Sequence, residues 1–329
     1  MNYRLYFLIH FARSGSTLLA NELDKNNSIG VTIEENLADG IKKGKPVNLK
    51  NTRDLDDYLE LLYKDEKFHF WNIEKNELRN HLLEACSFPL QFRDILQTIH
   101  SLYFEASRPE IVIHKQGNYS FFIGKVKTEF PKAGFLFIDR DPRAIYNSQK
   151  RSRKSTSSKS MNQGIVRFAL SYKRMHQMIR RYISEDYFYS FKYENFIKNK
   201  ISELQQLSDF LGIKPAENHK TESYSSRIPG PQKYLHQNVG GNYDLSRTEG
   251  WKKELENHRI VFLQTALKQE LLEKDYGLNS TNSLRPFQKV KVMYWCIIFR
   301  IAYFLLKSTN WHYFRSEERR VGKECIVKC

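Results

Sequence analysis

The chain has 329 residues, of which 40% are hydrophobic and 27% are charged. This length and apolar content suit a globular domain of enzyme size and exclude a disordered chain as the default. Lys and Arg number 53 against 37 Asp and Glu, which gives a formal charge of +16. The excess favours partners that carry phosphate, sulfate or carboxylate groups, without choosing among them.

The four cysteines, Cys86, Cys296, Cys325 and Cys329, form no C-x-x-C pair and are unevenly spaced. This pattern argues against a zinc site and against a disulfide framework, and it fits a reducing compartment. The first residues lack the basic segment, the long apolar core and the small-residue cleavage site of a secretory signal. We therefore expect a cytoplasmic location.

The first predicted strand, Arg4–His10, runs into R-S-G-S-T, after which a helical pattern begins. A strand–loop–helix unit of this kind directs backbone N–H groups and a helix N-terminus at one anion. Gly15 allows close approach of the backbone, and Ser16 and Thr17 add hydroxyl groups. Arg13 supplies a planar guanidinium, although a plain helix cap remains the alternative. The Walker lysine is absent, which disfavours an ATP and Mg²⁺ site.

Further strands are predicted at residues 29–33, 110–114, 134–139 and 187–191, with helical stretches between them. This alternation predicts βαβ units, a parallel sheet and an α/β fold. Residues 49–107 have a helical, aromatic and charged pattern, and Phe68, Phe70 and Trp71 are the expected packing anchors of this segment.

A second motif, R-D-P-R, follows the strand predicted at 134–139. Asp141 suits the N-cap of a helix and Pro142 suits its first position. Arg140 would then lie at the carboxyl end of the strand and Ser148 two turns into the helix, where both can hold one phosphate. The alternative is an ordinary capped helix with exposed arginines. Residues 140–181 are rich in Lys and Arg, and the Ser-rich part at 151–160 is expected to be a mobile loop.

Together, F-A-R-S-G-S-T-L-L and F-I-D-R-D-P-R-A-I-Y-N-S resemble the PAPS-dependent sulfotransferases, in which the first motif holds the 5′-phosphosulfate of PAPS and the second its 3′-phosphate. Supporting stretches are I-V-I-H-K, F-K-Y-E-N-F with L-S-D-F-L-G-I, and S-R-T-E-G-W-K-K-E-L. The resemblance covers residues 4–277. It implies a P-loop-like three-layer fold with a central parallel sheet flanked by helices, and sulfuryl transfer from PAPS to a hydroxyl or amine without a metal.

The resemblance also implies which residues bind the donor. Those on cofactor-binding positions of the family are Arg13, Ser14, Gly15, Ser16, Thr17, Arg140, Ser148, Tyr193 and Arg247. Lys115 resembles the family lysine that approaches the bridging oxygen of the leaving group, and Arg13 would share in stabilising the developing charge. Arg247 and Lys252 are weaker matches, because the loop before Trp251 varies in length among relatives.

The catalytic base is expected among two glutamates and two histidines. Glu34 and Glu35 follow the second predicted strand, which resembles the tyrosylprotein branch, where a glutamate at this place takes the proton. Aligned with that branch from Arg13 without a gap, Glu34 falls on the position of the family glutamate. One inserted residue places Glu35 there instead, and we prefer Glu35. At least one of them is expected to be a solvated strand-end charge. His10 and His114 are the competing bases, since cytosolic small-molecule relatives use a histidine.

The glutamate-type site and the helical insert at 49–107 resemble the carbohydrate and tyrosylprotein branches more than the aryl branch. We therefore expect the insert to shape the acceptor pocket, and the acceptor to be a carbohydrate or another hydroxylated metabolite. Ala12 and Gln116-Gly117 depart from prolines common in relatives. The alternatives are a P-loop-like kinase, which the missing lysine opposes, and a basic nucleic-acid or polyanion binder. Few aromatic residues interleave with the basic residues of 140–181, so no nucleic-acid partner is expected.

Near the C-terminal end, Met293–Leu306 is apolar apart from Arg300 and is flanked by Lys289, Lys291 and Lys307. Its length falls short of the roughly 20 residues of a membrane span. A helix docked on the domain is preferred, and peripheral membrane contact through 289–307 is the alternative. We thus expect a sulfotransferase domain at 1–280, a basic-flanked apolar helix at 285–314 and an unstructured tail at 315–329, part of which resembles a vector-derived peptide.

Overall fold

The computed structural model describes residues 3–35, 47–152, 161, 164–214, 224–228, 246–278 and 283–308. A five-stranded sheet in the order β2-β5-β1-β6-β7 forms its centre. The strands are β1 (Arg4–His10), β2 (Ile29–Val31), β5 (Ile111–Lys115), β6 (Gly134–Asp139) and β7 (Phe188–Lys192). All neighbours pair in parallel, as predicted, so the five carboxyl ends lie at one edge of the sheet.

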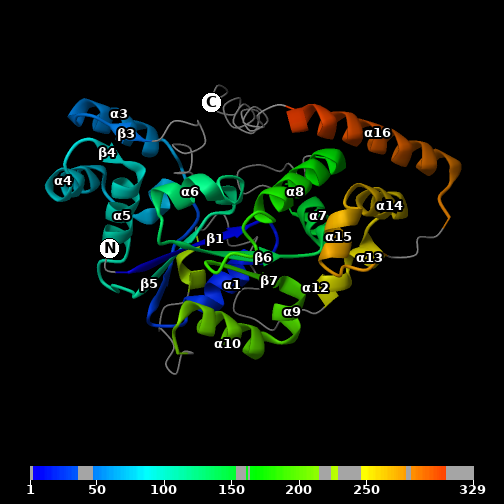
Figure 1. The fold of residues 1–329 in the computed structure, drawn as a ribbon, viewed down its shortest axis with the longest axis horizontal. Coiled ribbons are helices and arrows are strands. Elements are labelled where there is room, and N and C mark those ends of the chain that lie inside the picture. Colours follow the sequence, from blue (N-terminus) through cyan, green and yellow to red (C-terminus); the bar gives the residue numbers. More distant parts are fainter. Residues whose placement is uncertain are drawn as a thin grey trace. The chain divides into compact units, whose positions relative to one another are not determined.

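Helices cover both faces of this sheet. Figure 1 shows α1 and α10 on one side and α6 on the other, which confirms the three-layer α/β prediction. The α-helices are α1 (Ser16–Leu23), α3 (Thr52–Leu62), α4 (Lys75–Ala85), α5 (Phe92–Tyr103), α6 (Ile123–Glu129), α7 (Pro142–Arg151), α8 (Ile165–Ile179), α9 (Tyr193–Lys198), α10 (Lys200–Leu211), α12 (Ser246–Glu249), α13 (Trp251–Glu254), α14 (Asn257–Ala266), α15 (Lys268–Glu273) and α16 (Pro286–Ser308). Three short 3₁₀ helices are η1 (Phe68–Trp71), η2 (Gly117–Phe121) and η3 (Tyr224–Arg227).

The inner strands are apolar along nearly their whole length, as expected where helices bury both faces of a parallel sheet. Phe7 on β1 is fully buried, and its ring lies 5.1 Å from the ring of Tyr119 and 5.7 Å from that of Phe135. Aromatic packing on β1 therefore fixes the central strand, and with it the start of the loop that follows His10.

The segment 49–107 folds as α3, η1, α4 and α5, with β3 (Asn48–Leu49) and β4 (Leu90–Gln91) pairing antiparallel. Phe68 and Trp71 are buried anchors, as predicted. The prediction for Phe70 is wrong, because its side chain is 38% exposed. In a 3₁₀ turn residues i and i+3 share one side, so burying Phe68 and Trp71 leaves Phe70 on another.

Helix α7 begins as the sequence predicts. The Asp141 carboxylate accepts a hydrogen bond from the Arg143 backbone N–H at 2.8 Å, and Pro142 is the first helical residue. Arg143 is not an exposed arginine, because its guanidinium pairs with Asp141 at 2.8 Å and lies 4.1 Å from the ring of Trp251. Arg143 therefore ties α7 to α13 and is engaged in packing.

The chain divides into two compact units, Met1–Asn162 with Arg174–Glu254, and Gln163–Lys173 with Leu255–Cys329. The sheet lies in the first unit. In the second, α16 packs on α14 through rings such as Trp295, which lies 5.6 Å from Phe262. Among the described residues, no helix meets the length and hydropathy needed to cross a bilayer. Most of the expected mobile loop at 151–160 and the whole tail at 315–329 lie outside the described residues.

Candidate active site

A predicted site residue lies at, or within three residues of, the carboxyl end of each of the five parallel strands. Arg13 follows β1, Glu34 follows β2 and Tyr193 follows β7, while Lys115 ends β5 and Arg140 follows β6. In open α/β sheets, ligands bind outside the carboxyl ends of the strands. Residues far apart in the sequence therefore meet along one edge of the sheet.

The loop between β1 and α1 is a tight anion cradle. Gly15 has a φ of +103°, and a β-carbon at this position would lie 2.3 Å from the ring of Tyr193. Arg13 also adopts a positive φ, of 76°. Ser14 is fully buried, and no described residue lies within hydrogen-bond distance of its hydroxyl oxygen. A buried hydroxyl without a protein partner fits a site where a ligand supplies the missing acceptor.

The second predicted motif joins this loop through hydrogen bonds. The Arg140 guanidinium donates to the Arg13 carbonyl at 2.9 Å, and Arg13 Nε donates to the Ser148 hydroxyl at 3.3 Å. Arg140 also lies 4.2 Å from the ring centre of Tyr193. The two anion-binding motifs thus form one continuous basic group at the sheet edge.

The two weaker matches differ in their placement. The Arg247 carbonyl accepts a hydrogen bond from Arg140 at 2.9 Å, so the backbone of Arg247 borders the basic group while its side chain is exposed. Lys252 instead forms an exposed ion pair with Glu249 at 2.6 Å, one helical turn away. The structure brings the Arg247 backbone, and not the Lys252 ammonium, to the predicted site.

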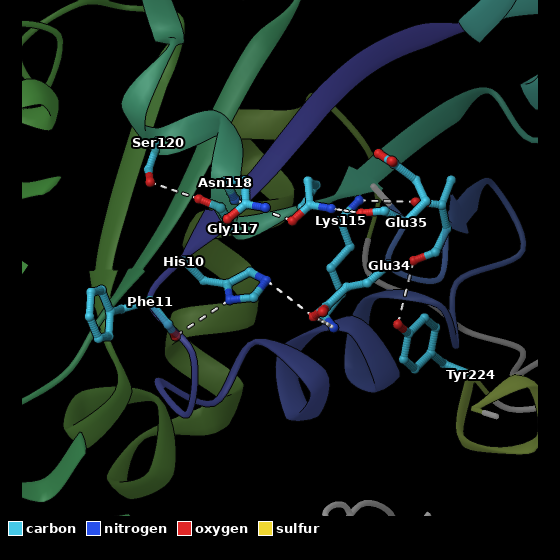
Figure 2. A network of polar contacts seen from close by, with 11 residues as sticks. His10, Phe11, Glu34, Glu35, Lys115, Gly117, Asn118, Ser120 and Tyr224 are labelled. Carbon is cyan, nitrogen blue, oxygen red and sulfur yellow. Dashed lines mark hydrogen bonds and ion pairs between the residues drawn. The ribbon is translucent and has the colours of Figure 1, made fainter. Parts of the chain in front are cut away.

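Glu34 lies between two basic side chains, as Figure 2 shows. Its carboxylate is 2.5 Å from Lys115 Nζ and 3.4 Å from His10 Nε2. Burial raises the pKa of Glu34, but the charge of Lys115 and the hydrogen bond and charge of His10 outweigh burial and hold the pKa well below its usual range. Glu34 is therefore ionised, and its side chain keeps 30% of its surface exposed.

Glu35 points the other way, into a buried row of hydrogen-bonded groups. His114 Nε2 lies 2.9 Å from the Glu35 carboxylate, His100 Nε2 lies 3.0 Å from His114 Nδ1, and the Tyr3 hydroxyl lies 2.9 Å from His100 Nδ1. Burial lowers the pKa of His114 to about 3 and lowers that of His100 well below its usual range, so both imidazoles are neutral. A neutral imidazole has one N–H donor and one acceptor nitrogen, so each ring can donate a hydrogen bond to the next group in the direction from Tyr3 to Glu35.

The structure places the two candidate glutamates differently. The Glu35 side chain is 0% exposed and the Tyr119 hydroxyl also lies 3.5 Å from its carboxylate, whereas the Glu34 side chain is 30% exposed. Consecutive side chains of an extended segment point to opposite sides, which separates Glu34 from Glu35 and Lys115 from His114. Glu34 is thus the partly exposed carboxylate of the two, and the fully buried His114 side chain lies with Glu35.

Several residues at the site were missed in the sequence. Thr32 accepts a hydrogen bond from the Lys115 backbone N–H at 3.0 Å. Tyr224 on η3 donates to the Thr32 carbonyl at 3.4 Å, and its ring centre lies 5.8 Å from Lys115 Nζ. Arg227 donates to the Val31 carbonyl at 3.1 Å. Residues 224–227 lie some 190 positions beyond β2 and carry no motif, so the sequence offers no signal for them.

Comparisons with known proteins place this site in a family. The sequence profile described as "Sulfotransferase family" matches residues 7–217, which include the first phosphate loop, Glu34, Lys115, Arg140, Ser148 and Tyr193. The chain therefore belongs to the sulfotransferase family and is a sulfotransferase enzyme. None of the curated proteins compared with the chain matches it.

Two solved sulfotransferase domains share the fold of this chain. The sulfotransferase domain of the curacin biosynthetic pathway is 18% identical with a TM-score of 0.56, covering 85% of this chain and 99% of its own. The sulfotransferase domain of the olefin synthase of Synechococcus PCC 7002 is also 18% identical, with a TM-score of 0.56. The match covers 84% of this chain and 96% of that domain. A mouse sulfotransferase complexed with PAP is 10% identical, with a TM-score of 0.44. The match covers 83% of this chain and 86% of the mouse chain. Among the described residues, no group of three or more His, Cys, Asp or Glu is arranged to hold a metal ion.

Proposed function

We propose that this sulfotransferase transfers the sulfuryl group of PAPS to a hydroxyl or amine of its acceptor and releases PAP. One observation carries the proposal: the basic group of Arg13, Arg140 and Ser148 lies on the same sheet edge as the paired Glu34 and Lys115. Anion binding and proton transfer are thereby available at one place.

The residues present fit the donor. The backbone and hydroxyls of Ser14–Thr17, at the N-terminus of α1, would hold the 5′-phosphosulfate together with Arg13. Arg140 and Ser148 would hold the 3′-phosphate, with Tyr193 beside the nucleotide. When bound, PAPS supplies a sulfuryl group on a phosphate leaving group. The loop before α1 lacks the Walker lysine, which disfavours the kinase alternative.

Glu34 and Lys115 would divide the chemistry between them. Glu34 removes the acceptor proton as general base, and Lys115 stabilises the charge that develops on the leaving phosphate. With Lys115 drawn to that phosphate, the pKa of Glu34 rises, because the charge that lowers it has moved away. The carboxylate would thus become a stronger base when the donor is in place. His10 supports Glu34 from the other side at 3.4 Å.

For the acceptor we propose a carbohydrate or another hydroxylated metabolite. A role for the insert at 49–107 in shaping the acceptor pocket is supported by its packing on β5, the strand that ends at Lys115: the ring of Trp71 on η1 lies 6.3 Å from that of His114. We also propose a cytoplasmic location, which the free thiols of Cys86 and Cys296 support.

Ligand-induced thermal stabilisation tests the proposal. PAP should raise the melting temperature at micromolar concentration, whereas ATP and an oligonucleotide should have little effect. Arg140→Ala should weaken PAP binding about 10- to 100-fold, because it removes charge-assisted hydrogen bonds. Arg93→Ala, at an exposed arginine of α5, is the matched control and should leave affinity unchanged. Stabilisation by the oligonucleotide and not by PAP would overturn the proposal.

A further inference from the structure

Helix α16 is apolar on two opposite sides, and only one of them is packed. Val292, Phe299 and Leu306 are each at most 9% exposed. The ring of Phe299 lies 6.1 Å from that of Phe262, and Trp295 stacks on His258 at 5.5 Å. This side of the helix rests on α14 within the second unit.

The opposite side presents an exposed row of large apolar residues. The row is spaced three or four residues apart and consists of Phe287, Val290, Tyr294, Ile297, Ile301 and Phe304, which are between 49% and 74% exposed. This spacing aligns side chains along one face of a helix. A continuous apolar face of this length is unusual on a soluble surface and marks an interaction site.

Positive charges border this apolar row. Lys289, Lys291 and Arg300 are exposed, and residues 285–308 contain no Asp or Glu. At about 100° per residue, Lys289 and Arg300 fall along one edge of the row and Lys291 along the other. Long basic side chains in such positions cover apolar surface with their stems and extend their charges outward.

We propose that α16 lies flat on a bilayer of anionic lipids, with the apolar row in the acyl boundary and the bordering cations on the headgroups. This is the geometry of an interfacial amphipathic helix. A second copy of the chain is the poorer occupant, because pairing two such rows would bring basic edges together without an acidic partner. The inference does not depend on the donor or the acceptor.

Vesicle flotation of the full chain tests the inference. We expect the protein to float with vesicles of phosphatidylcholine and phosphatidylglycerol, and much less with phosphatidylcholine alone. Each of Lys289→Gln, Lys291→Gln and Arg300→Gln should lower the partition coefficient about fivefold, because each removes one attraction to the anionic surface. Ile301→Ser with Phe304→Ser should abolish flotation. Ile201→Ser, at a residue of α10 that is 84% exposed, is the control.

Two further measurements separate binding to anionic lipid from association between copies of the chain. Rising NaCl should release the unmodified protein from anionic vesicles, since surface charges are screened. Sedimentation without lipid should show the same mass for the unmodified protein and for Ile301→Ser with Phe304→Ser. Failure to float with anionic vesicles overturns the inference, as does a dimer that this double variant dissociates.

Discussion

The Glu34–Lys115 pair and the Glu35–His114 pair are built from neighbouring residues and differ in almost every physical property. The first joins opposite charges and leaves Glu34 30% exposed. The second is wholly buried and joins a carboxylate to an imidazole that burial keeps neutral. Identical side chains one residue apart are thus suited to different tasks, because the extended backbone turns one toward the site and the other into the core.

The buried pair has a positioning task. The Gln116 side chain donates to the Glu35 carbonyl, and the Lys115 backbone donates to Thr32, so the end of β5 is tied to the segment after β2 on both sides of Glu34. The row from Tyr3 to Glu35 anchors this junction to α5 through His100. The placement of Glu34 and Lys115 therefore depends on a neighbouring pair, Glu35 and His114, that is fully buried.

The largest effect should separate the two glutamates. Glu34→Gln should lower turnover about 100-fold or more with PAP affinity nearly kept, because it removes the general base. Glu35→Gln should lower turnover less than about tenfold, since Gln can still accept the His114 hydrogen bond. Steady-state kinetics and PAP titration measure both. A greater loss of turnover for Glu35→Gln would invert the comparison.

A smaller effect concerns the pH dependence of the exposed pair. The pKa of Glu34 is held low, so kcat/KM should not decline on the acid side until the pH falls well below the usual range of a glutamate. In Lys115→Met the pKa of Glu34 rises, and the acid limb should move up by about one to three pH units. Lys125→Met, at an exposed lysine of α6, is the control. If the acid side of the kcat/KM profile stays in place in Lys115→Met, the ion pair with Lys115 does not set the pKa of Glu34.

A third effect is expected in the pH dependence of folding stability, to which the buried pair contributes. The pKa of His114 is about 3 in the folded protein and about 6.5 when unfolded, so the unfolded state binds the proton first as the pH falls. The stabilisation is complete above pH 6.5 and should decline by about 1.4 kcal/mol per pH unit toward pH 3. His114→Gln removes this share of the slope. Urea unfolding at several pH values measures it.

The exposed His81 provides the control for this measurement. His81→Gln should leave the slope of unfolding free energy against pH as in the unmodified protein. His100, whose pKa is also lowered, should contribute the slope that persists in His114→Gln. Equal slopes for the unmodified protein and His114→Gln would contradict a neutral buried imidazole at residue 114.

The sequence sufficed to predict the sheet and the start of α7, because both depend on local patterns. The apolar runs give the strands, and the capping chemistry of Asp141 and Pro142 gives the start of α7. The sequence alone does not settle the choice between Glu34 and Glu35, because the side that an extended residue faces depends on what packs behind it. His100 and Tyr224 reach the site region only through tertiary packing, and no spacing in the sequence records that contact.

Tyr193 touches both anion-binding motifs with one ring. Its face carries the Arg140 guanidinium, and its edge closes over Gly15, where even a methyl group would overlap it. A side chain introduced at Gly15 would push this ring and so displace the Arg140 guanidinium that packs on its face. A change in either motif is therefore transmitted to the other through the ring of Tyr193.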